Sequence, residues 1–252
     1  WQDPAAGIAL AHRRLAIQDL SPAGHQPMAS HDGRWVIVYN GEIYNNAALR
    51  AELASAGAAE VWRGHSDTET LLACIGRWGI AETLERLTGM FAFAAWDRET
   101  RELHLARDRL GEKPLYVGWV GKGLAFGSEL KALRTLPGFD AAIDRQALAG
   151  LMSFNSVPGT RSIYEGITRL RPGCRLVVTT DDVARRRLPA PVPYWQIAEV
   201  ARAGHAAPAR FDSDAAATDA LEATLAAAVE SQMISDVPLG AFLSGGIDSS
   251  TI

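Results

Sequence analysis

Seven short apolar runs, several of them joined by turn-like residues, divide the segment from Gly7 to about Val178. Two of the connections, residues 97–100 and 121–123, are short enough to form hairpins, which are typical of antiparallel strands and not of strand-helix-strand units. The pattern therefore predicts an α+β domain. The expected strands are residues 8–12, 35–39, 90–96, 103–107, 115–120, 124–127 and 176–179.

Two further segments carry apolar residues at helical spacing and end at a glycine, a residue that often terminates a helix. The first has Leu49 and Leu53 on one face and ends at Gly57. The second has its apolar face over residues 71–78 and ends at Gly79. We expect both helices to cover the sheets.

A stretch rich in proline and arginine follows this domain. Residues 185–211 begin with three consecutive arginines, contain four prolines and lack sustained apolar periodicity. This composition predicts a linker. We therefore expect a first domain over residues 1–184, the linker, and the truncated start of a second domain over residues 212–252.

The second domain is expected to open with a helix and a strand. Apolar residues recur at every fourth position from Leu221 to Met233, behind Asp212 and Ser213, either of which can cap a helix. The apolar run 237–243 then predicts a buried strand that leads into a glycine-rich turn.

That turn, residues 244–250, reads Ser-Gly-Gly-Ile-Asp-Ser-Ser. Glycines let the backbone approach a phosphate, while hydroxyls and the N–H groups of a following helix can donate to it. No lysine follows the second glycine, so the turn is not a Walker A loop. A structural strand-to-helix turn is the alternative. The segment resembles the Ser-Gly-Gly-x-Asp-Ser signature of ATP pyrophosphatases, which implies that ATP and pyrophosphate are bound by Leu243, Ser244, Gly245, Gly246, Asp248 and Ser249.

Each of three motifs in the first domain, taken alone, can be explained by local structure. Asn40 and Gly41 follow an alternating strand and are a hairpin signal. Arg14 is a charge at a strand end, although a guanidinium can also clamp a carboxylate. Ser66 and Glu69 have the spacing of a capping box.

Taken together, and placed ahead of residues 244–250, these motifs resemble the glutamine-dependent asparagine synthetases. In that family an N-terminal-nucleophile glutaminase domain precedes an ATP pyrophosphatase domain. The resemblance covers nearly the whole chain and is weakest in the linker; further matching segments are residues 90–94, 106–116, 126–133 and 167–173. It implies a four-layer sandwich of two antiparallel sheets covered by helices, followed by the start of an α/β ATP pyrophosphatase domain.

The resemblance also implies a role for individual residues. Arg14 would bind the α-carboxylate of glutamine, and Asp67 would bind its α-ammonium group. The side-chain amide of Asn40 and the backbone N–H of Gly41 would form the oxyanion hole for the tetrahedral intermediate. The other residues lining the pocket would be Leu15, Ile17 and Glu42.

The nucleophile is where the sequence departs from the family. Its nucleophile is a cysteine at the mature N-terminus, whereas residue 1 here is Trp1. Cys74 lies on an apolar helix face and Cys174 follows a Pro-Gly turn, so we expect both to be structural. We read the chain as a fragment whose nucleophile lies upstream, and we expect the fragment itself to be inactive. A degenerate glutamine-binding protein without the cysteine is the alternative.

The implied reaction converts ATP, L-aspartate, L-glutamine and water into AMP, diphosphate, L-asparagine and L-glutamate. Aspartate would be activated as a β-aspartyl-adenylate and attacked by ammonia from glutamine, with Mg²⁺ screening the phosphate charge. A related amidotransferase or cyclase acting on another carboxylate is an alternative, because we expect the acceptor site to lie beyond residue 252. An amidotransferase for phosphoribosyl or sugar-phosphate acceptors, which shares only the glutaminase half, is disfavoured by residues 244–250.

The composition argues against some classes of binding partner for this protein. With 25 Lys and Arg against 29 Asp and Glu, the net charge of -4 provides no basic field for nucleic acid. No apolar run approaches the roughly 18 residues of a membrane helix, and two cysteines are too few for a disulfide framework. We therefore expect small-molecule partners, no nucleic acid, no membrane and a cytoplasmic location; a homodimer stays open.

Overall fold

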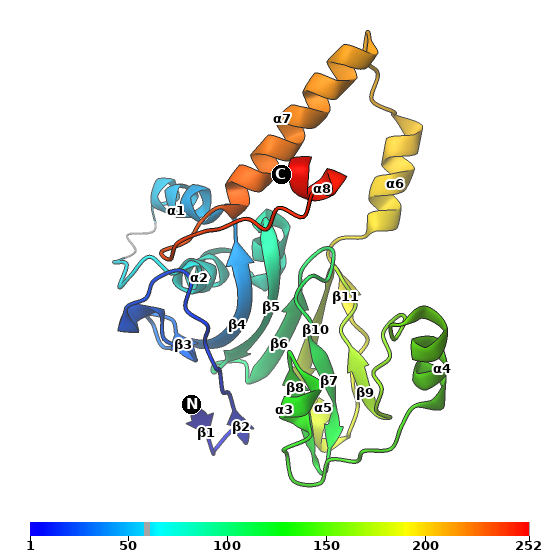
Figure 1. The fold of residues 1–252 in the computed structure, drawn as a ribbon. Coiled ribbons are helices and arrows are strands. Elements are labelled where there is room, and N and C mark those ends of the chain that lie inside the picture. Colours follow the sequence, from blue (N-terminus) through cyan, green and yellow to red (C-terminus); the bar gives the residue numbers. More distant parts are fainter. Residues whose placement is uncertain (58–60, 252) are drawn as a thin grey trace.

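The computed structural model describes residues 1–57 and 61–251, and a large antiparallel sheet lies at its centre (Figure 1). Six strands form this sheet in the order β11-β10-β6-β5-β4-β3, and each neighbouring pair is antiparallel. The strands are β3 (Met28–Ala29), β4 (Trp35–Ile43), β5 (Gly89–Asp97), β6 (Glu102–Arg107), β10 (Cys174–Thr179) and β11 (Val192–Pro193).

A second antiparallel sheet has the order β8-β7-β9, and a separate hairpin pairs β1 with β2 near the N-terminus. The expected hairpins β5–β6 and β7–β8 are both present. The α+β fold is thus confirmed, although the strand expected over residues 8–12 is reduced to β2. The remaining strands are β1 (Gln2–Asp3), β2 (Ile8–Ala9), β7 (Tyr116–Val120), β8 (Gly123–Gly127) and β9 (Ile167–Arg169).

Helices cover the outer faces of the two sheets. α1 packs on α2, α2 packs on β4 of the large sheet, and α3 packs on β8 of the small one. In the part of the chain that the structure describes, no helix is long and apolar enough to span a membrane. The helices are η1 (Pro22–Gly24, a 3-10 turn), α1 (Asn46–Ser55), α2 (Asp67–Arg86), α3 (Leu130–Leu133), α4 (Arg145–Phe154), α5 (Thr180–Ala184), α6 (Ile197–Ala206), α7 (Asp214–Gln232) and α8 (Ile247–Thr251).

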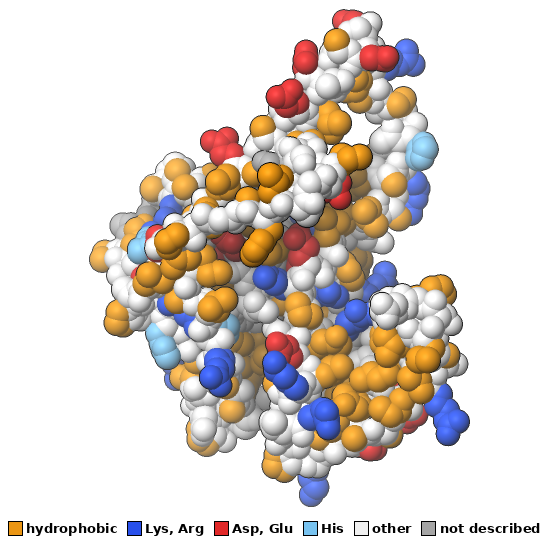
Figure 2. Space-filling view, in the orientation of Figure 1, with side chains coloured by type: hydrophobic (Ala, Val, Ile, Leu, Met, Phe, Trp, Pro, Cys, Tyr) orange, Lys and Arg blue, Asp and Glu red, His pale blue; other side chains and the backbone are white. Residues whose placement is uncertain are grey.

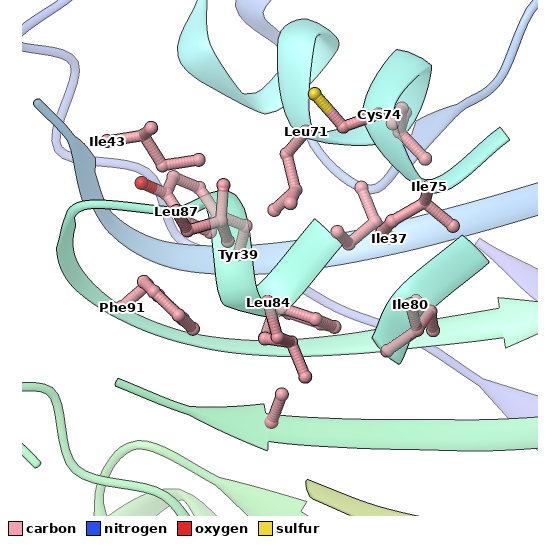
Figure 3. Packing of buried hydrophobic residues seen from close by; sticks show 14 of the residues in the cluster. Ile37, Tyr39, Ile43, Leu71, Cys74, Ile75, Ile80, Leu84, Leu87 and Phe91 are labelled. Atoms are coloured by element: carbon pink, nitrogen blue, oxygen red, sulfur yellow. The ribbon is translucent and has the colours of Figure 1, made fainter. Parts of the chain in front are cut away.

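Three separate hydrophobic clusters show that the fold has four layers. The first lies between α1, α2 and the large sheet and includes Leu49 of α1. Leu71 of α2 and Ile37 of β4 belong to the same cluster (Figure 3). The second lies between the two sheets, where Val38 and Val117 belong to one cluster. The third lies between the small sheet and α3 and is formed by Val120, Ala125, Leu133 and Ile167. The helix-sheet-sheet-helix sandwich implied by the resemblance is therefore confirmed.

Strand β4 shows why its sequence reads as an unbroken apolar run. Successive side chains of a strand point to opposite faces of the sheet. Ile37 and Tyr39 belong to the cluster under the helices, whereas Val36 and Val38 belong to the cluster between the sheets. Both faces are buried, so every position from Trp35 to Tyr39 is apolar or aromatic.

The second predicted helix was expected to end at Gly79. Gly79 does leave the helical conformation, with φ at +73°, but α2 resumes after this kink and continues to Arg86. Ile80 and Leu84 follow the kink and are 6% and 0% exposed. The glycine changes the direction of the helix, and burial of these two side chains stabilises its continuation.

The segment expected to be a linker, residues 185–211, contains regular structure. β11 pairs with β10 as the edge strand of the large sheet, and Tyr194 packs against the cluster beneath the helices. Helix α6 follows, although it has no buried residue. The expected helix of the second segment is confirmed as α7, and Ser213 caps it by accepting a hydrogen bond from Ala216 N.

The prediction of a strand over residues 237–243 is wrong. No strand in the described part of the chain pairs with this segment, and Phe242 and Leu243 are 100% and 75% exposed. Hydrophobic side chains also lie on the surface over α7 and the segment after it (Figure 2). An apolar run becomes a strand only where a neighbouring strand satisfies its backbone groups.

Candidate active site

Asn40 and Gly41 lie within strand β4, and this overturns their reading as a hairpin turn. They pair with Ala92 and Phe91 in an antiparallel register that runs without interruption to Ile43. A Cβ atom added at Gly41 would lie 2.2 Å from the carbonyl oxygen of Met90. Glycine is required here because the neighbouring strand approaches closely, not because the chain turns.

The amide of Asn40 extends from the half-buried end of β4 towards the second sheet. Its Nδ2 donates to Ser128 Oγ at 3.0 Å. Ser128 lies just after β8, so this contact joins the ends of strands from both sheets. The hydrogen bond fixes the orientation of a donor that an oxyanion hole would need.

Arg14 is held by the turn that follows it. Its Nη2 donates to the carbonyl oxygens of Gln18 and Asp19, the second at 2.8 Å. The guanidinium also packs against η1, where a Cβ at Gly24 would lie 2.4 Å from Nη2. Leu15 and Ile17, in the same turn, are 84% and 40% exposed, so their backbone and not their side chains would have to line a pocket.

Asp67 is buried at the start of α2 and is tied to the end of β4. Its Oδ2 accepts hydrogen bonds from Tyr39 OH at 2.8 Å and from Ile43 N at 3.0 Å. Burial raises the pKa of Asp67, and these two hydrogen bonds and the nearby charge of Arg14 act in the opposite direction. The carboxylate is therefore fixed between the start of α2 and the end of β4.

Glu42 joins the turn after Arg14 to strand β4. Its Oε1 accepts a hydrogen bond from Gln18 Nε2 at 2.7 Å. Burial raises the pKa of Glu42, and the hydrogen bond from Gln18 lowers it in part. The structure thus places Asn40, Gly41, Glu42 and Asp67 at the end of β4. Arg14 lies near enough to act on the pKa of Asp67, and the turn after Arg14, which contains Leu15 and Ile17, reaches β4 through the Gln18–Glu42 hydrogen bond.

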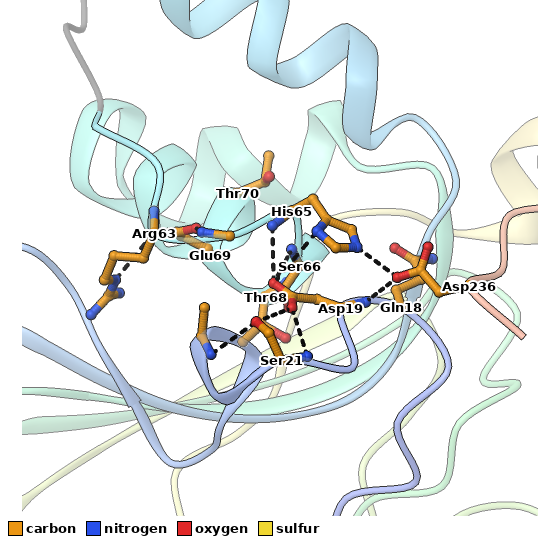
Figure 4. A network of polar contacts seen from close by, with 12 residues as sticks. Gln18, Asp19, Ser21, Arg63, His65, Ser66, Thr68, Glu69, Thr70 and Asp236 are labelled. Carbon is orange, nitrogen blue, oxygen red and sulfur yellow. Dashed lines mark hydrogen bonds and ion pairs between the residues drawn. The ribbon is translucent and has the colours of Figure 1, made fainter.

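The expected capping box at the start of α2 forms only in part. Ser66 is the N-cap, and its Oγ accepts from Thr68 N at 3.2 Å. Glu69 does not return to the cap; its carboxylate accepts from the backbone N–H groups of Arg63 and Gly64 instead (Figure 4). The loop before the helix supplies these donors and competes with the cap for the same side chain.

Five residues around the site were not predicted as part of it: Gln18, Asp19, His65, Ser128 and Asp236. Asp19 had a local signal, since it precedes a Ser-Pro pair typical of turns. Ser128 lay in one of the matching segments without an assigned role. The contact of Asp236 with His65 spans 171 residues of sequence and has no local signal.

The predicted nucleotide-binding residues form an exposed loop ahead of the short helix α8. Gly245 has φ at +74°, and the hydroxyls of Ser244 and Ser249 lie 2.9 Å apart across the turn. Asp248, in the first turn of α8, is exposed. Leu243 and Gly246 complete the loop, which makes its own internal contacts without burial of its side chains.

Both cysteines are buried, as expected of structural residues. Cys74 is 0% exposed in the cluster beneath the helices, and Cys174 is 3% exposed at the start of β10. Burial raises the pKa of the Cys174 thiol. A raised thiol pKa disfavours the thiolate that acts as a nucleophile.

A pocket of about 250 Å³ lies elsewhere, between the turn after β3 and α2. Of its lining residues, Glu69 alone was named in a motif, and it was given no role in binding. Among the described residues, no group of three or more His, Cys, Asp or Glu side chains could hold a metal ion.

Comparison with known proteins identifies both parts of the chain. Residues 1–195 match the glutamine amidotransferase domain family, and residues 220–252 match the asparagine synthase family. A Mycobacterium tuberculosis (strain ATCC 25618 / H37Rv) protein, provisionally assigned as a glutamine-hydrolysing asparagine synthetase, is 40% identical over 255 residues, which cover 98% of this chain and 37% of the relative. Asparagine synthetase (glutamine-hydrolysing) 3 of Bacillus subtilis (strain 168) is 37% identical, over 97% of this chain and 38% of the relative.

Among solved structures, the glutamine phosphoribosylpyrophosphate amidotransferase from B. subtilis, complexed with ADP and GMP, has a TM-score of 0.47 and 23% identity over 73% of this chain and 34% of that one. The chain spans only 37% and 38% of the length of the two relatives named above. The family match nevertheless covers residues 1–195 and is continued by the second match from residue 220. The chain therefore belongs to the glutamine amidotransferase domain family, in the arrangement of the glutamine-hydrolysing asparagine synthetases.

Proposed function

We propose that the gene product carrying this chain makes L-asparagine from L-aspartate, with L-glutamine as nitrogen donor and ATP as the activating substrate. The observation that carries the proposal is the grouping of Arg14, Asp67, Asn40 and Gly41 at the end of β4. These residues supply one cation, one anion and two N–H donors, which are the groups that glutamine and its tetrahedral intermediate require.

Arg14 and Asp67 would fix glutamine by its two charged ends. The guanidinium of Arg14, oriented by two carbonyl oxygens, would pair with the α-carboxylate. The carboxylate of Asp67, oriented by Tyr39 and Ile43, would pair with the α-ammonium group. Glu42 and the backbone of Leu15 and Ile17 would line the pocket between them. With the amino acid held in this way, its side-chain amide is presented to the end of β4.

Asn40 and Gly41 would stabilise the oxyanion formed when a thiolate attacks the amide carbon. Their N–H groups are held in place before the reaction, which is what makes such donors effective. Collapse of the tetrahedral intermediate releases ammonia and leaves an acyl-enzyme that water hydrolyses to glutamate. We assign the attack to neither Cys74 nor Cys174, since both are buried in structural clusters.

The loop from Leu243 to Ser249 would hold the phosphates of ATP. Gly245 and Gly246 leave the backbone accessible, and Ser244 and Ser249 provide hydroxyls. The exposed carboxylate of Asp248 is the acidic group in this loop and fits a Mg²⁺ ion, which usually takes one or two carboxylates together with substrate phosphates. Bound Mg²⁺ would neutralise charge on the pyrophosphate that leaves when aspartate is adenylated.

We also place these reactions in the cytoplasm, where ATP and free amino acids are available and cysteines stay reduced. Both cysteines are buried and lie in different hydrophobic clusters, which agrees with thiols that have packing roles.

The test supplies the gene product with glutamine labelled by ¹⁵N at its side-chain amide, together with Mg-ATP and aspartate. We expect ¹⁵N-asparagine, glutamate, AMP and diphosphate in equal amounts. Glutamate and diphosphate with a different ¹⁵N-labelled product, after aspartate is replaced by other carboxylates, would identify a related amidotransferase. Binding of glutamine without glutamate release would identify a binding protein and overturn the proposal.

Arg14→Lys is expected to raise the KM for glutamine about tenfold or more, because lysine keeps the charge and loses the planar fork that pairs with a carboxylate. The KM for ammonia, measured in asparagine formation without glutamine, should stay the same. Arg13→Lys, at an exposed neighbouring position, is the matched control and should change neither constant. An unchanged glutamine KM in Arg14→Lys would remove Arg14 from the pocket.

A further inference from the structure

One carboxylate joins the segment before the nucleotide loop to the first domain. Asp236 lies between α7 and α8, and its Oδ2 accepts a hydrogen bond from Asp19 N at 2.6 Å (Figure 4). The same oxygen lies 2.6 Å from His65 Nε2. The backbone N–H of Asp236 also donates to Ile17 O at 2.9 Å. Three contacts therefore hold this residue against two turns of the first domain.

These two turns support the two charged residues proposed to bind glutamine. The first turn provides the carbonyl oxygens of Gln18 and Asp19 that orient the guanidinium of Arg14. The second contains His65 and leads directly into Asp67 at the start of α2.

The buried carboxylate of Asp19 connects the two turns. Its Oδ2 accepts from His65 N at 2.9 Å and from Ser66 N at 3.3 Å, and its Oδ1 accepts from Ser21. Burial acts to raise the pKa of Asp19, but the hydrogen bonds from Ser21 and His65 outweigh it and lower the pKa. The negative charge of Asp19 is thus retained close to Asp236, and the cationic form of His65 offsets both.

On the basis of the function proposed above, we propose that Asp236 is a positioning residue: it ties the segment entering the nucleotide loop to the turns that orient Arg14 and Asp67, and so couples nucleotide binding to glutamine affinity. A nucleotide that moves residues 237–244 would act on both turns through Asp236. Coupling of this kind is reciprocal, so glutamine would also change the affinity for the nucleotide.

The contact between His65 and Asp236 depends on pH. The hydrogen bond to Asp236 raises the pKa of His65, with a further contribution from Asp19 and an opposing one from Arg50. The ion pair between His65 and Asp236 is therefore present when the pH is below the raised pKa of His65, and it weakens as the pH rises through that pKa. We expect the glutamine KM to increase over that range in the wild type and to show no such step in His65→Gln.

The decisive variant is Asp236→Ala in the gene product, with Asp219→Ala, an exposed aspartate on α7, as the matched control. We expect Asp236→Ala to raise the glutamine KM by about five- to tenfold, which is the effect of losing a typical coupling free energy between two sites. The glutamine KM of this variant should no longer depend on Mg-ATP. The ammonia KM should stay within about twofold, because ammonia does not use the pocket. Asp236→Asn keeps an acceptor oxygen and should have an intermediate effect.

Hydrogen exchange of the amides provides a readout that needs no turnover. Peptides covering residues 17–20 and 64–67 should exchange faster in Asp236→Ala than in the wild type or in Asp219→Ala, since Asp19 N–H donates directly to Asp236. If the wild type hydrolyses no glutamine, the proposed function fails, and the exchange experiment alone decides whether Asp236 ties the segments. Unchanged exchange in both peptides, or equal losses with glutamine and ammonia, would overturn the inference.

Discussion

Replacing Asn40 by alanine is expected to lower kcat for glutamine hydrolysis by about 10²–10³-fold, the usual cost of removing one donor from an oxyanion hole. The Nδ2 of Asn40 is held by Ser128 Oγ at the end of β4, so the donor is oriented before substrate arrives. Asparagine formation from free ammonia should persist, because that reaction forms no oxyanion from glutamine. Steady-state rates with the two nitrogen donors, measured on the same preparation, test this.

Asn45→Ala is the matched control for this experiment. The Asn45 amide donates to Arg86 O and accepts from Thr88 N, so it joins chain segments without facing the end of β4 where Asn40 lies. We expect Asn45→Ala to lower the free energy of unfolding by about 1 kcal/mol. Its rates with glutamine and with ammonia should both equal those of the wild type. If Asn40→Ala kept both rates, as this control does, or reduced both alike, Asn40 would be a structural residue of β4.

Ser128→Ala separates donation from orientation. It leaves the Asn40 amide in place but removes the hydroxyl that accepts from it. The expected decrease in glutaminase kcat is smaller than in Asn40→Ala, because the donor is present but less fixed.

The fold of the first domain could be predicted because its signals are local. The apolar run of β4, the short turns between β5 and β6 and between β7 and β8, and the end of α1 just before Gly57 all follow from residues close in sequence. Family-level motifs added the order of the layers. The same reasoning failed for residues 237–243, where an apolar run has no partner strand in the described part of the chain.

The site could be predicted only in part, because several of its constraints act over long distances in sequence. Gly41 looked like a turn residue, yet its lack of a side chain accommodates the backbone of Met90 on the next strand. The link between His65 and Asp236 joins residues 171 positions apart. Neither constraint leaves a local pattern, so both required the structure.

Asp108 shows another such constraint, and it supports the strand opposite Gly41. The side chain is 0% exposed, and its two oxygens accept hydrogen bonds from five backbone N–H groups. One of the donors is Phe91, the β5 residue that pairs with Gly41. The others belong to the loop that follows Asp108: Leu110, Gly111, Glu112 and Lys113.

Asp108→Ala should therefore lower the free energy of unfolding by about 3–5 kcal/mol, since it leaves several buried donors without an acceptor. Equilibrium unfolding in urea measures this change. Asp140→Ala is the control: this exposed carboxylate accepts from Ala142 N in a surface turn, and its loss should cost about 1 kcal/mol or less. Asp108→Asn retains one acceptor oxygen, and its free energy of unfolding should lie between those of Asp108→Ala and Asp140→Ala.

Because Phe91 N–H is one of the freed donors, Asp108→Asn should also reduce glutaminase kcat more than ammonia-dependent synthesis. Equal stability of Asp108→Ala and Asp140→Ala would mean that the loop satisfies its own donors and that the register of β5 beside Gly41 does not depend on Asp108.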